Sequence, residues 1–286
     1  MASGTALWPG IDLADLIAAL QLTDTGAADP APHAARFRAR NVPSRLPTTL
    51  GSQVLAQAVV AAERVVPGMA VQSIQGVFPR GGVAADPVGI DVEIVQSGRA
   101  LATVAVTFQQ EGREHCRALV MLSRDEPDFL RHQRPLPDDV PRPDACADLP
   151  VALMPWEVRT FGGEDALAPD LAGPPALDVW MRCKDVDDSP TLSRALLAHG
   201  TEGFLGPVAL RPYPADHIAA RGGKGTSVML SQTVTFHEPF SIHEWLLLRC
   251  ESVYAGRSRM HGRIHVYAED GRLVASVAAD GLMRVA

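Results

Sequence analysis

Val71-Gln72-Ser73-Ile74-Gln75-Gly76-Val77-Phe78 lines up, 158 residues later, with Met229-Leu230-Ser231-Gln232-Thr233-Val234-Thr235-Phe236. The same spacing relates three further pairs, which are Glu93 and Glu251, Gly98 and Gly256, and Arg99 and Arg257. Identical residues at one fixed spacing indicate a single supersecondary unit that is used twice. The chain is therefore expected to hold a duplicated domain, with any functional site on a pseudo-symmetric frame.

Composition narrows the class of protein. A chain of 286 residues, 47% apolar and 21% charged, is typical of a globular protein with two domains. A net charge of −7 argues against nucleic acid as the main partner. The sequence shows no secretion signal and no apolar run long enough to span a bilayer. Its four cysteines are too widely spaced for a CxxC motif, so we expect free thiols and a cytoplasmic location.

The first copy reads as helices followed by an antiparallel meander. Residues 11–22 have helical periodicity and predict a short leader helix. Residues 51–66 are apolar over most of a helical surface, which predicts a core helix ended by Pro67-Gly68. Strands are then expected at 69–78, 88–96, 100–110 and 114–122, with turns at Ser97-Gly98 and Glu111-Gly112.

The second copy begins near Leu177, after a proline-rich segment over residues 124–150. Ser189-Pro190 predicts a helix start, because a capping side chain precedes a proline at the first helical position. Proline and glycine over 206–227 predict a long irregular segment. Residues 259–268 alternate in polarity and predict a half-exposed strand, followed by a turn at Asp270-Gly271.

An apolar helix followed by a meander is buried most simply when the sheet curls around the helix. The prediction is therefore an α+β protein with two tandem hotdog domains, each an antiparallel sheet wrapped around a central helix. Residues 1–123 form the first domain with its leader helix, 124–150 the linker, and 151–286 the second domain.

Several motifs resemble the type II acyl-CoA thioesterases, the TesB-like double-hotdog enzymes. Leu50-Gly51-Ser52-Gln53-Val54-Leu55-Ala56-Gln57-Ala58 is close to the family's FGGQVxxQA. Further matches, running in order, are Phe78-Pro79-Arg80-Gly81-Gly82, Ser97-Gly98-Arg99, Phe236-His237-Glu238-Pro239-Phe240, Glu244-Trp245-Leu246-Leu247, Asp270 to Ser276 and Asp280 to Arg284. The resemblance covers about residues 11–284 and includes both copies.

The resemblance implies hydrolysis of fatty acyl-CoA to free fatty acid and CoA, without a covalent intermediate or a cofactor. The family's carboxylate lies in a segment like LAYxSD, which here ends in Glu202, so Glu202 is the predicted catalytic residue. At the family's Thr and Gln positions this chain has Met229, or an immediate neighbour, and Ala279. Two of the three family side chains are thus predicted to be replaced, and Asp280 could act in the place of Glu202.

Substrate contacts are predicted at four residues. Gly51 opens the core helix, whose free N–H groups could bind an oxyanion, although Gly51 could equally serve close packing. Gln53 and Gln57 share one helical stripe and could line an acyl tunnel, or could be buried and bonded to backbone. Lys224, in a glycine-rich segment without P-loop spacing, could meet CoA phosphates.

Other chemistries fit less well. His261 and His265 share a strand face but have no third ligand, so no metal site is predicted. Hotdog hydratases usually carry an Asp–His pair on the central helix, which this sequence lacks. An acyl-CoA thioesterase is therefore the first hypothesis, and a double-hotdog protein that binds acyl-CoA without hydrolysing it is the alternative. A homo-oligomer is an expectation of the resemblance alone.

Overall fold

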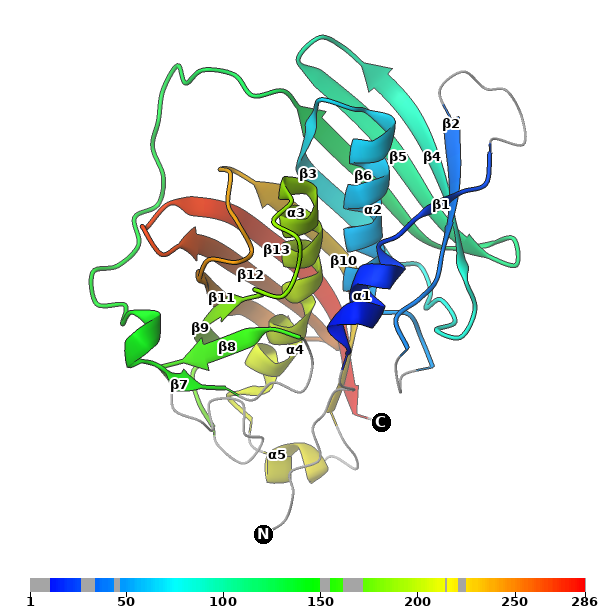
Figure 1. Cartoon of the computed structure of the whole chain (residues 1–286). Helices are drawn as coiled ribbons and strands as arrows, with labels where there is room; N and C mark the ends of the chain where they lie inside the picture. Colours follow the sequence, from blue (N-terminus) through cyan, green and yellow to red (C-terminus); the bar gives the residue numbers. More distant parts are fainter. Residues whose placement is uncertain are drawn as a thin grey trace.

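The computed structural model describes residues 11–26, 34–43, 47–149, 155–161, 172–213, 215–220 and 225–285. Its thirteen strands form one antiparallel sheet (Figure 1), in the order β1-β2-β4-β5-β6-β3-β10-β13-β12-β11-β9-β8-β7. The strands are β1 (Thr23–Asp24), β2 (Ala34–Ala39), β3 (Ala70–Val77), β4 (Val88–Ser97), β5 (Leu101–Gln110), β6 (Arg113–Ser123), β7 (Ala147–Asp148), β8 (Glu157–Thr160), β9 (Ala176–Arg182), β10 (Gly225–Phe236), β11 (Leu246–Gly256), β12 (Arg259–Ala268) and β13 (Leu273–Val285).

The sheet has a pseudo-twofold axis at its centre, where β3 of the first copy pairs with β10 of the second. Gln75 pairs with Thr233, which is its own equivalent in the 158-residue repeat. On either side of that pair, Ile74 lies opposite Val234 and Gly76 opposite Gln232. Counted outward from this seam, the first five strands of one half, β3-β6-β5-β4-β2, have equivalents in the same order in the other half, β10-β13-β12-β11-β9. The predicted duplicated domain is therefore confirmed.

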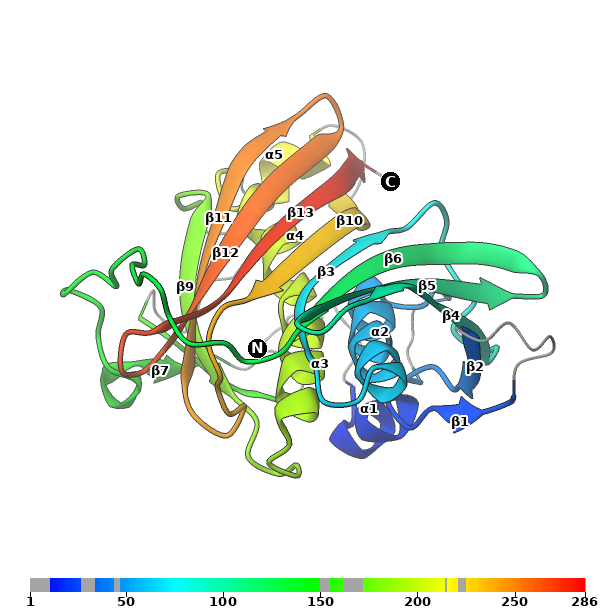
Figure 2. The same ribbon diagram turned by 90° about the horizontal axis from the view of Figure 1, so that it is seen from above.

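Each half of the sheet curls around one central helix, as Figure 2 shows from above. Helix α2 (Gly51–Val65) lies in the first half, and ten of its residues are buried. Helix α3 (Pro190–Gly200) lies in the second half, and its first turn is capped by Ser189, whose side chain accepts from the Leu192 N–H. Both helices were predicted, and the α+β double-hotdog architecture is confirmed.

The two central helices lie side by side and run in opposite directions (Figures 1 and 2). Near the end of α2, the Glu63 carboxylate accepts from Arg194 Nε at 2.7 Å and from the Thr191 hydroxyl at 2.5 Å. Arg194 and Thr191 belong to the start of α3. The Arg194 and Glu63 side chains are only 15% and 9% exposed, so this ion pair joins the two halves in a largely buried place.

One prediction was wrong in the second copy. The segment expected to be irregular contains helix α4 (Glu202–Leu210) and the short helix α5 (Ala215–Ala219) before β10. Pro207 lies inside α4 and costs it a backbone hydrogen bond. That cost is offset by burial of Phe204, Leu205 and Val208 against the sheet, and tertiary burial can override helix propensity.

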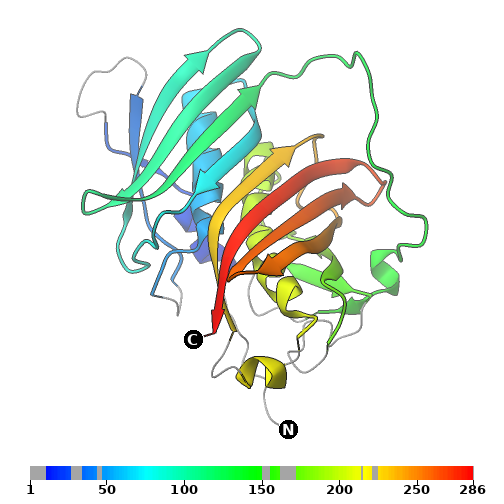
Figure 3. The ribbon, with the colours of Figure 1, turned by 180° about the vertical axis from the view of Figure 1, so that it is seen from behind.

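The segment from Arg124 to Leu149 runs around the edge of the second half, past the turn between β12 and β13 (Figure 3), and has little regular structure, as predicted. It contains only the 3-10 turn η1 (Pro143–Ala145) and β7. The leader helix is also present, as α1 (Leu13–Ala19). The domain boundaries at 123 and 150 stay predictions. No helix in the described ranges is long and apolar enough to cross a membrane.

Candidate functional site

Helix α2 begins without a cap of its own. Its N-cap residue is Leu50, which has no side-chain oxygen to accept from the first N–H groups of the helix. Such N–H groups have no partner within their helix, and the helix dipole favours a negative charge beside them. The acceptor comes from the other half of the molecule, where Glu202 Oε2 accepts from the Ser52 N–H at 2.5 Å. The site thus needs both halves of the fold.

The Glu202 carboxylate lies in a partly desolvated place and accepts several hydrogen bonds. Burial raises the pKa of Glu202, and hydrogen bonds from the Ser52 side chain and from the Ser52 and Gly51 N–H groups partly oppose that rise. Among the described residues, no Lys, Arg or His forms an ion pair with Glu202. A desolvated carboxylate without a counter-ion is suited to accept a proton from a bound water.

Gly200, two residues before Glu202, packs closely on the side chain of Met181. It is the last residue of α3, and a Cβ at this position would lie 2.5 Å from Met181 Cε and 3.5 Å from the Trp156 ring. A side chain there would therefore require the end of the Met181 side chain to move. Because α4 starts at Glu202 directly after Thr201, a shift of α3 would displace the carboxylate as well.

The two halves each place a glutamate beside the start of the other half's central helix. Glu63 of α2 contacts Thr191 in the first turn of α3, and Glu202 contacts Ser52 in the first turn of α2. The charge of Glu63 is matched by Arg194. Glu202 has no cationic partner in the described part of the chain. Of the two glutamates, only Glu202 is therefore a carboxylate without a counter-ion.

The sequence analysis did not identify two further polar residues, Thr201, which precedes Glu202, and Gln232, which binds Thr201. Thr201 is fully buried, and its hydroxyl accepts from Gln232 Nε2 at 2.7 Å. Gln232 itself is 1% exposed and faces the helices from β10. The sequence repeat could have pointed to Gln232, because its equivalent in the first copy is the apolar residue Ile74. Ile74 is also fully buried.

Gln53 and Gln57 are both buried, and both bind residues of the chain that precedes α2. Gln53 accepts from the Val42 N–H at 2.8 Å and donates to Asn41 Oδ1 at 2.7 Å. Gln57 Nε2 donates to the carbonyl oxygens of Ala19 and Arg40. These bonds favour the interpretation in which buried amides are satisfied by their neighbours. Substrate contact by either residue stays a prediction.

The other two predicted substrate contacts are Gly51 and Lys224. Gly51 packs closely on Phe78, since a Cβ there would lie 3.1 Å from Phe78 Cζ, and its N–H also helps to hold Glu202. The N–H groups proposed as oxyanion donors are thus engaged by the carboxylate itself. Lys224 lies outside the described residues.

Asp280, the alternative to Glu202, is on the opposite face of the sheet. Its side chain is 57% exposed and binds His261 at 2.9 Å and the Ser231 hydroxyl at 3.0 Å. Alternation along β13 turns its neighbour Ala279 inward, where Ala279 lies opposite Gln232. Asp280 therefore does not share a site with Glu202.

Met229 and Ala279 both belong to the inner face. Ala279 is 1% exposed, and Met229 packs against the core opposite Gly281. Both positions are therefore apolar on the side of the sheet that faces the helices. Across the described ranges, no three His, Cys, Asp or Glu side chains are grouped as metal ligands.

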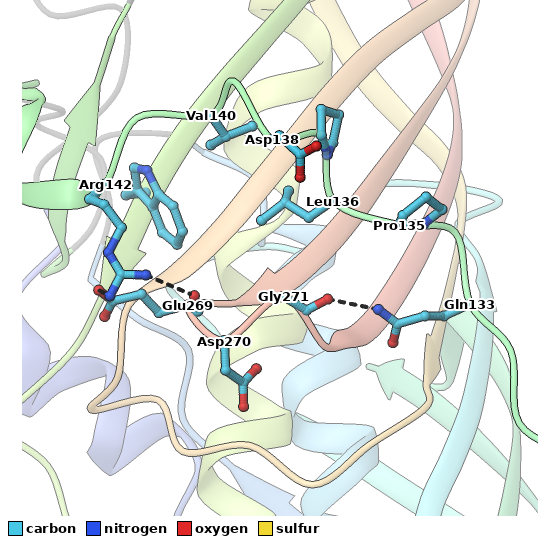
Figure 4. A pocket seen from close by; sticks show the side chains of 11 residues that line it. Gln133, Pro135, Leu136, Asp138, Val140, Arg142, Glu269, Asp270 and Gly271 are labelled. Carbon is cyan, nitrogen blue, oxygen red and sulfur yellow. Dashed lines mark hydrogen bonds and ion pairs between the residues drawn. The ribbon is translucent and has the colours of Figure 1, made fainter.

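A separate pocket of about 460 Å³ lies on the outer face, between the linker and the turn from β12 to β13 (Figure 4). Its apolar wall is formed by Trp180, Leu136 and Val140, and Arg142 bridges its rim by an ion pair with Glu269 at 3.2 Å. None of the predicted site residues that the structure describes lines this pocket. It is a gap beneath the linker, remote from the inner face that carries Glu202.

Comparison with known families gives two matches that together span most of the chain. A family described as the acyl-CoA thioesterase N-terminal domain matches residues 42–123. A second, the acyl-CoA thioesterase C-terminal domain, matches residues 131–283.

Individual relatives have low sequence identity to this chain, but the matches cover most of each protein. Acyl-coenzyme A thioesterase 8 of Homo sapiens is 26% identical over 275 residues, covering 87% of this chain and 84% of that protein. Acyl-CoA thioesterase 2 of Haemophilus influenzae is 26% identical over 265 residues, covering 82% and 87%. The crystal structure of an acyl-CoA thioesterase II, TesB2, from Mycobacterium marinum is 28% identical with a TM-score of 0.76, covering 95% of this chain and 98% of that one.

Proposed function

The chain belongs to the TesB-like acyl-CoA thioesterase II family, and we propose that it hydrolyses acyl-CoA thioesters to a free fatty acid and CoA. The observation that carries the proposal is the Glu202 carboxylate, which is held at the start of α2 and has no cationic partner among the residues that the structure describes. A thioester is activated enough that one positioned water and one base can hydrolyse it.

In the proposed reaction, Glu202 accepts a proton from water while the water oxygen bonds to the thioester carbonyl carbon. The tetrahedral intermediate then breaks its C–S bond, and Glu202 returns the proton to the departing sulfur. The raised pKa of Glu202 supports this role, because a base is most effective when its pKa approaches the working pH. No covalent acyl-enzyme forms at any step.

The positive end of α2 supports the same chemistry. Ser52 and Gly51 hold the carboxylate through N–H groups, and the helix dipole stabilises negative charge at this end. As the proton moves, negative charge passes from Glu202 toward the carbonyl oxygen within the same field.

A second candidate is supported by the inner face of the second half. Met229 and Ala279 are apolar there, at positions that resemble those of the family's hydrogen-bonding Thr and Gln. A protein with this face could bind acyl-CoA and leave the thioester intact. The two candidates share a ligand and differ in turnover.

The test is release of free thiol from acyl-CoA substrates of short, medium and long chain, with wild type and Glu202→Gln. We expect turnover by wild type and a loss of about 10²- to 10⁴-fold in kcat for the variant, the usual contribution of a general base. Saturable binding without thiol release at any chain length would favour the second candidate. Unchanged turnover in Glu202→Gln would remove Glu202 from the mechanism.

A further inference from the structure

Gln232 is a polar residue in an apolar row. It faces inward from β10, in phase with the buried residues Val234 and Phe236. Its equivalent across the pseudo-twofold axis is Ile74, which is 0% exposed. An amide in such a place costs free energy unless it is fully hydrogen-bonded. The second copy has therefore exchanged an apolar core position for an amide, and that exchange needs an explanation.

One end of the amide holds the joint between α3 and α4. Gln232 Nε2 donates to Thr201 Oγ1 at 2.7 Å, and the Thr201 hydroxyl donates in turn to the Ala198 carbonyl at 3.0 Å. Thr201 is the C-cap of α3 and directly precedes Glu202. The chain of bonds thus runs from the sheet to the residue that carries the carboxylate into place.

The other end of the amide is unsatisfied. Gln232 Oε1 is buried and has no hydrogen-bond partner among the described residues. The nitrogen and oxygen of an amide are assigned from such contacts, so one end stays free in either orientation. Leaving a buried polar atom unpaired costs about 1–3 kcal/mol. The residue directly opposite Gln232 on β13 is the small Ala279.

We infer that Gln232 is a positioning residue for Glu202, acting through Thr201, with its free amide end available to a water in the same site. The inference rests on the proposed function, and it extends that function to a residue on a different element. A structural role alone would be met by an apolar residue, as Ile74 shows in the first copy.

Four variants test this inference. Gln232→Leu removes the amide, Thr201→Val removes its partner, and Thr201→Ser keeps the hydroxyl. Ser193→Ala is the control, because it removes another buried hydroxyl of α3, one that accepts from the Ile242 N–H at 3.1 Å. kcat and KM for acyl-CoA hydrolysis and the melting temperature are measured for each, and for the double variant Gln232→Leu/Thr201→Val.

We expect kcat to fall about 10- to 100-fold in Gln232→Leu and in Thr201→Val, with KM changed less than about 3-fold. The double variant should lose no more than the worse single variant, because both changes break one interaction. Thr201→Ser should keep most of the activity, and Ser193→Ala should lose stability alone. Wild-type kcat in both Gln232→Leu and Thr201→Val, with Glu202→Gln inactive, would overturn the inference and leave the proposed function standing.

A second readout does not depend on turnover. The Glu202 carboxyl is titrated by ¹³C NMR, with its signal assigned from Glu202→Gln. The residues that contact Glu202, Gly51 and Ser52, are uncharged. Burial lowers the pKa of His199 in α3 to about 4, so His199 is neutral near pH 7. An equal shift of the titration midpoint in Gln232→Leu and Thr201→Val supports the inference even if wild type hydrolyses nothing. An unmoved midpoint in both overturns it.

Discussion

At the scale of the residue, the protonation state of Glu202 affects both the stability of the fold and the proposed reaction. Because burial raises its pKa, the folded state favours the protonated carboxyl more than the unfolded state does. Its contribution to stability is therefore present at low pH and is lost as pH rises through the folded-state pKa. Ionised Glu202, the form that the proposed reaction needs, is also the form that destabilises the fold.

Glu202→Gln should consequently melt at a higher temperature than wild type at pH 8, and the difference should shrink as pH falls toward 4. Calorimetry of both proteins across this range measures it. The same shift places the acid limb of the kcat profile above 4.5, the ordinary pKa of glutamate, because protonation removes the base. A variant less stable than wild type at pH 8 would mean that the hydrogen bonds to the carboxylate outweigh its desolvation.

His199 should act in the opposite direction. It is buried, neither ring nitrogen has a partner in the described structure, and burial lowers its pKa from 6.5 to about 4. The unfolded chain therefore binds a proton more tightly between these values, and stability is lost as pH falls from 6.5 toward 4. The loss amounts to roughly 3 kcal/mol.

Replacing His199 with Leu should remove this part of the pH dependence. Urea unfolding of wild type and His199→Leu at pH 7 and pH 4.5 gives the comparison. We expect wild type to lose more stability than the variant on acidification. Parallel losses in the two proteins would show that His199 titrates normally.

At the scale of the element, α2 and α3 are joined by a charge pair that has little access to water. Glu63 accepts from Arg194, from the Thr191 hydroxyl and from the Val71 N–H. Glu63→Gln leaves the Arg194 charge without its partner, and breaking a buried pair in this way costs about 3–5 kcal/mol. Chemical denaturation measures the loss.

The exposed pair Arg40–Asp15 is the control for this prediction. Its side chains are 54% and 37% exposed, so Asp15→Asn should cost at most about 1 kcal/mol. An equal effect of the two substitutions would contradict the proposed importance of the Glu63 contact between the halves.

The sequence predicted elements better than it predicted the site. The repeat spacing and apolar periodicity predicted the helices α1, α2 and α3 and the strands β3 to β6 and β12, and these are present, whereas the short strands β1, β2, β7 and β8 were not predicted. Helix α4 was missed because Pro207 argues locally against a helix that only tertiary burial stabilises. Glu202 was found through a motif, whereas Thr201 and Gln232 meet only because β10 and the α3–α4 joint converge in space. Such convergence is not visible in local pattern.

At the scale of the whole molecule, the duplication produced one site from two halves. The continuous sheet is joined at β3 and β10, the helices α2 and α3 pack on each other, and Glu202 of one half caps the helix of the other. At the equivalent place beside the start of α3, Arg194 neutralises the charge of Glu63. The fold is thus symmetric, while the partners of the two glutamates differ.

This arrangement predicts that the covalent linker is dispensable once the protein has folded. Phe129 in the linker is 96% exposed, so a protease site inserted there should be cut without disturbing the sheet. The two fragments should co-elute as one species by size exclusion and keep wild-type turnover, because the contacts at the seam and between the helices persist. Each fragment expressed alone should be inactive, since Ser52 and Glu202 belong to different halves. Separation of the cut fragments under native conditions would show that the linker, and not the seam, holds the halves together.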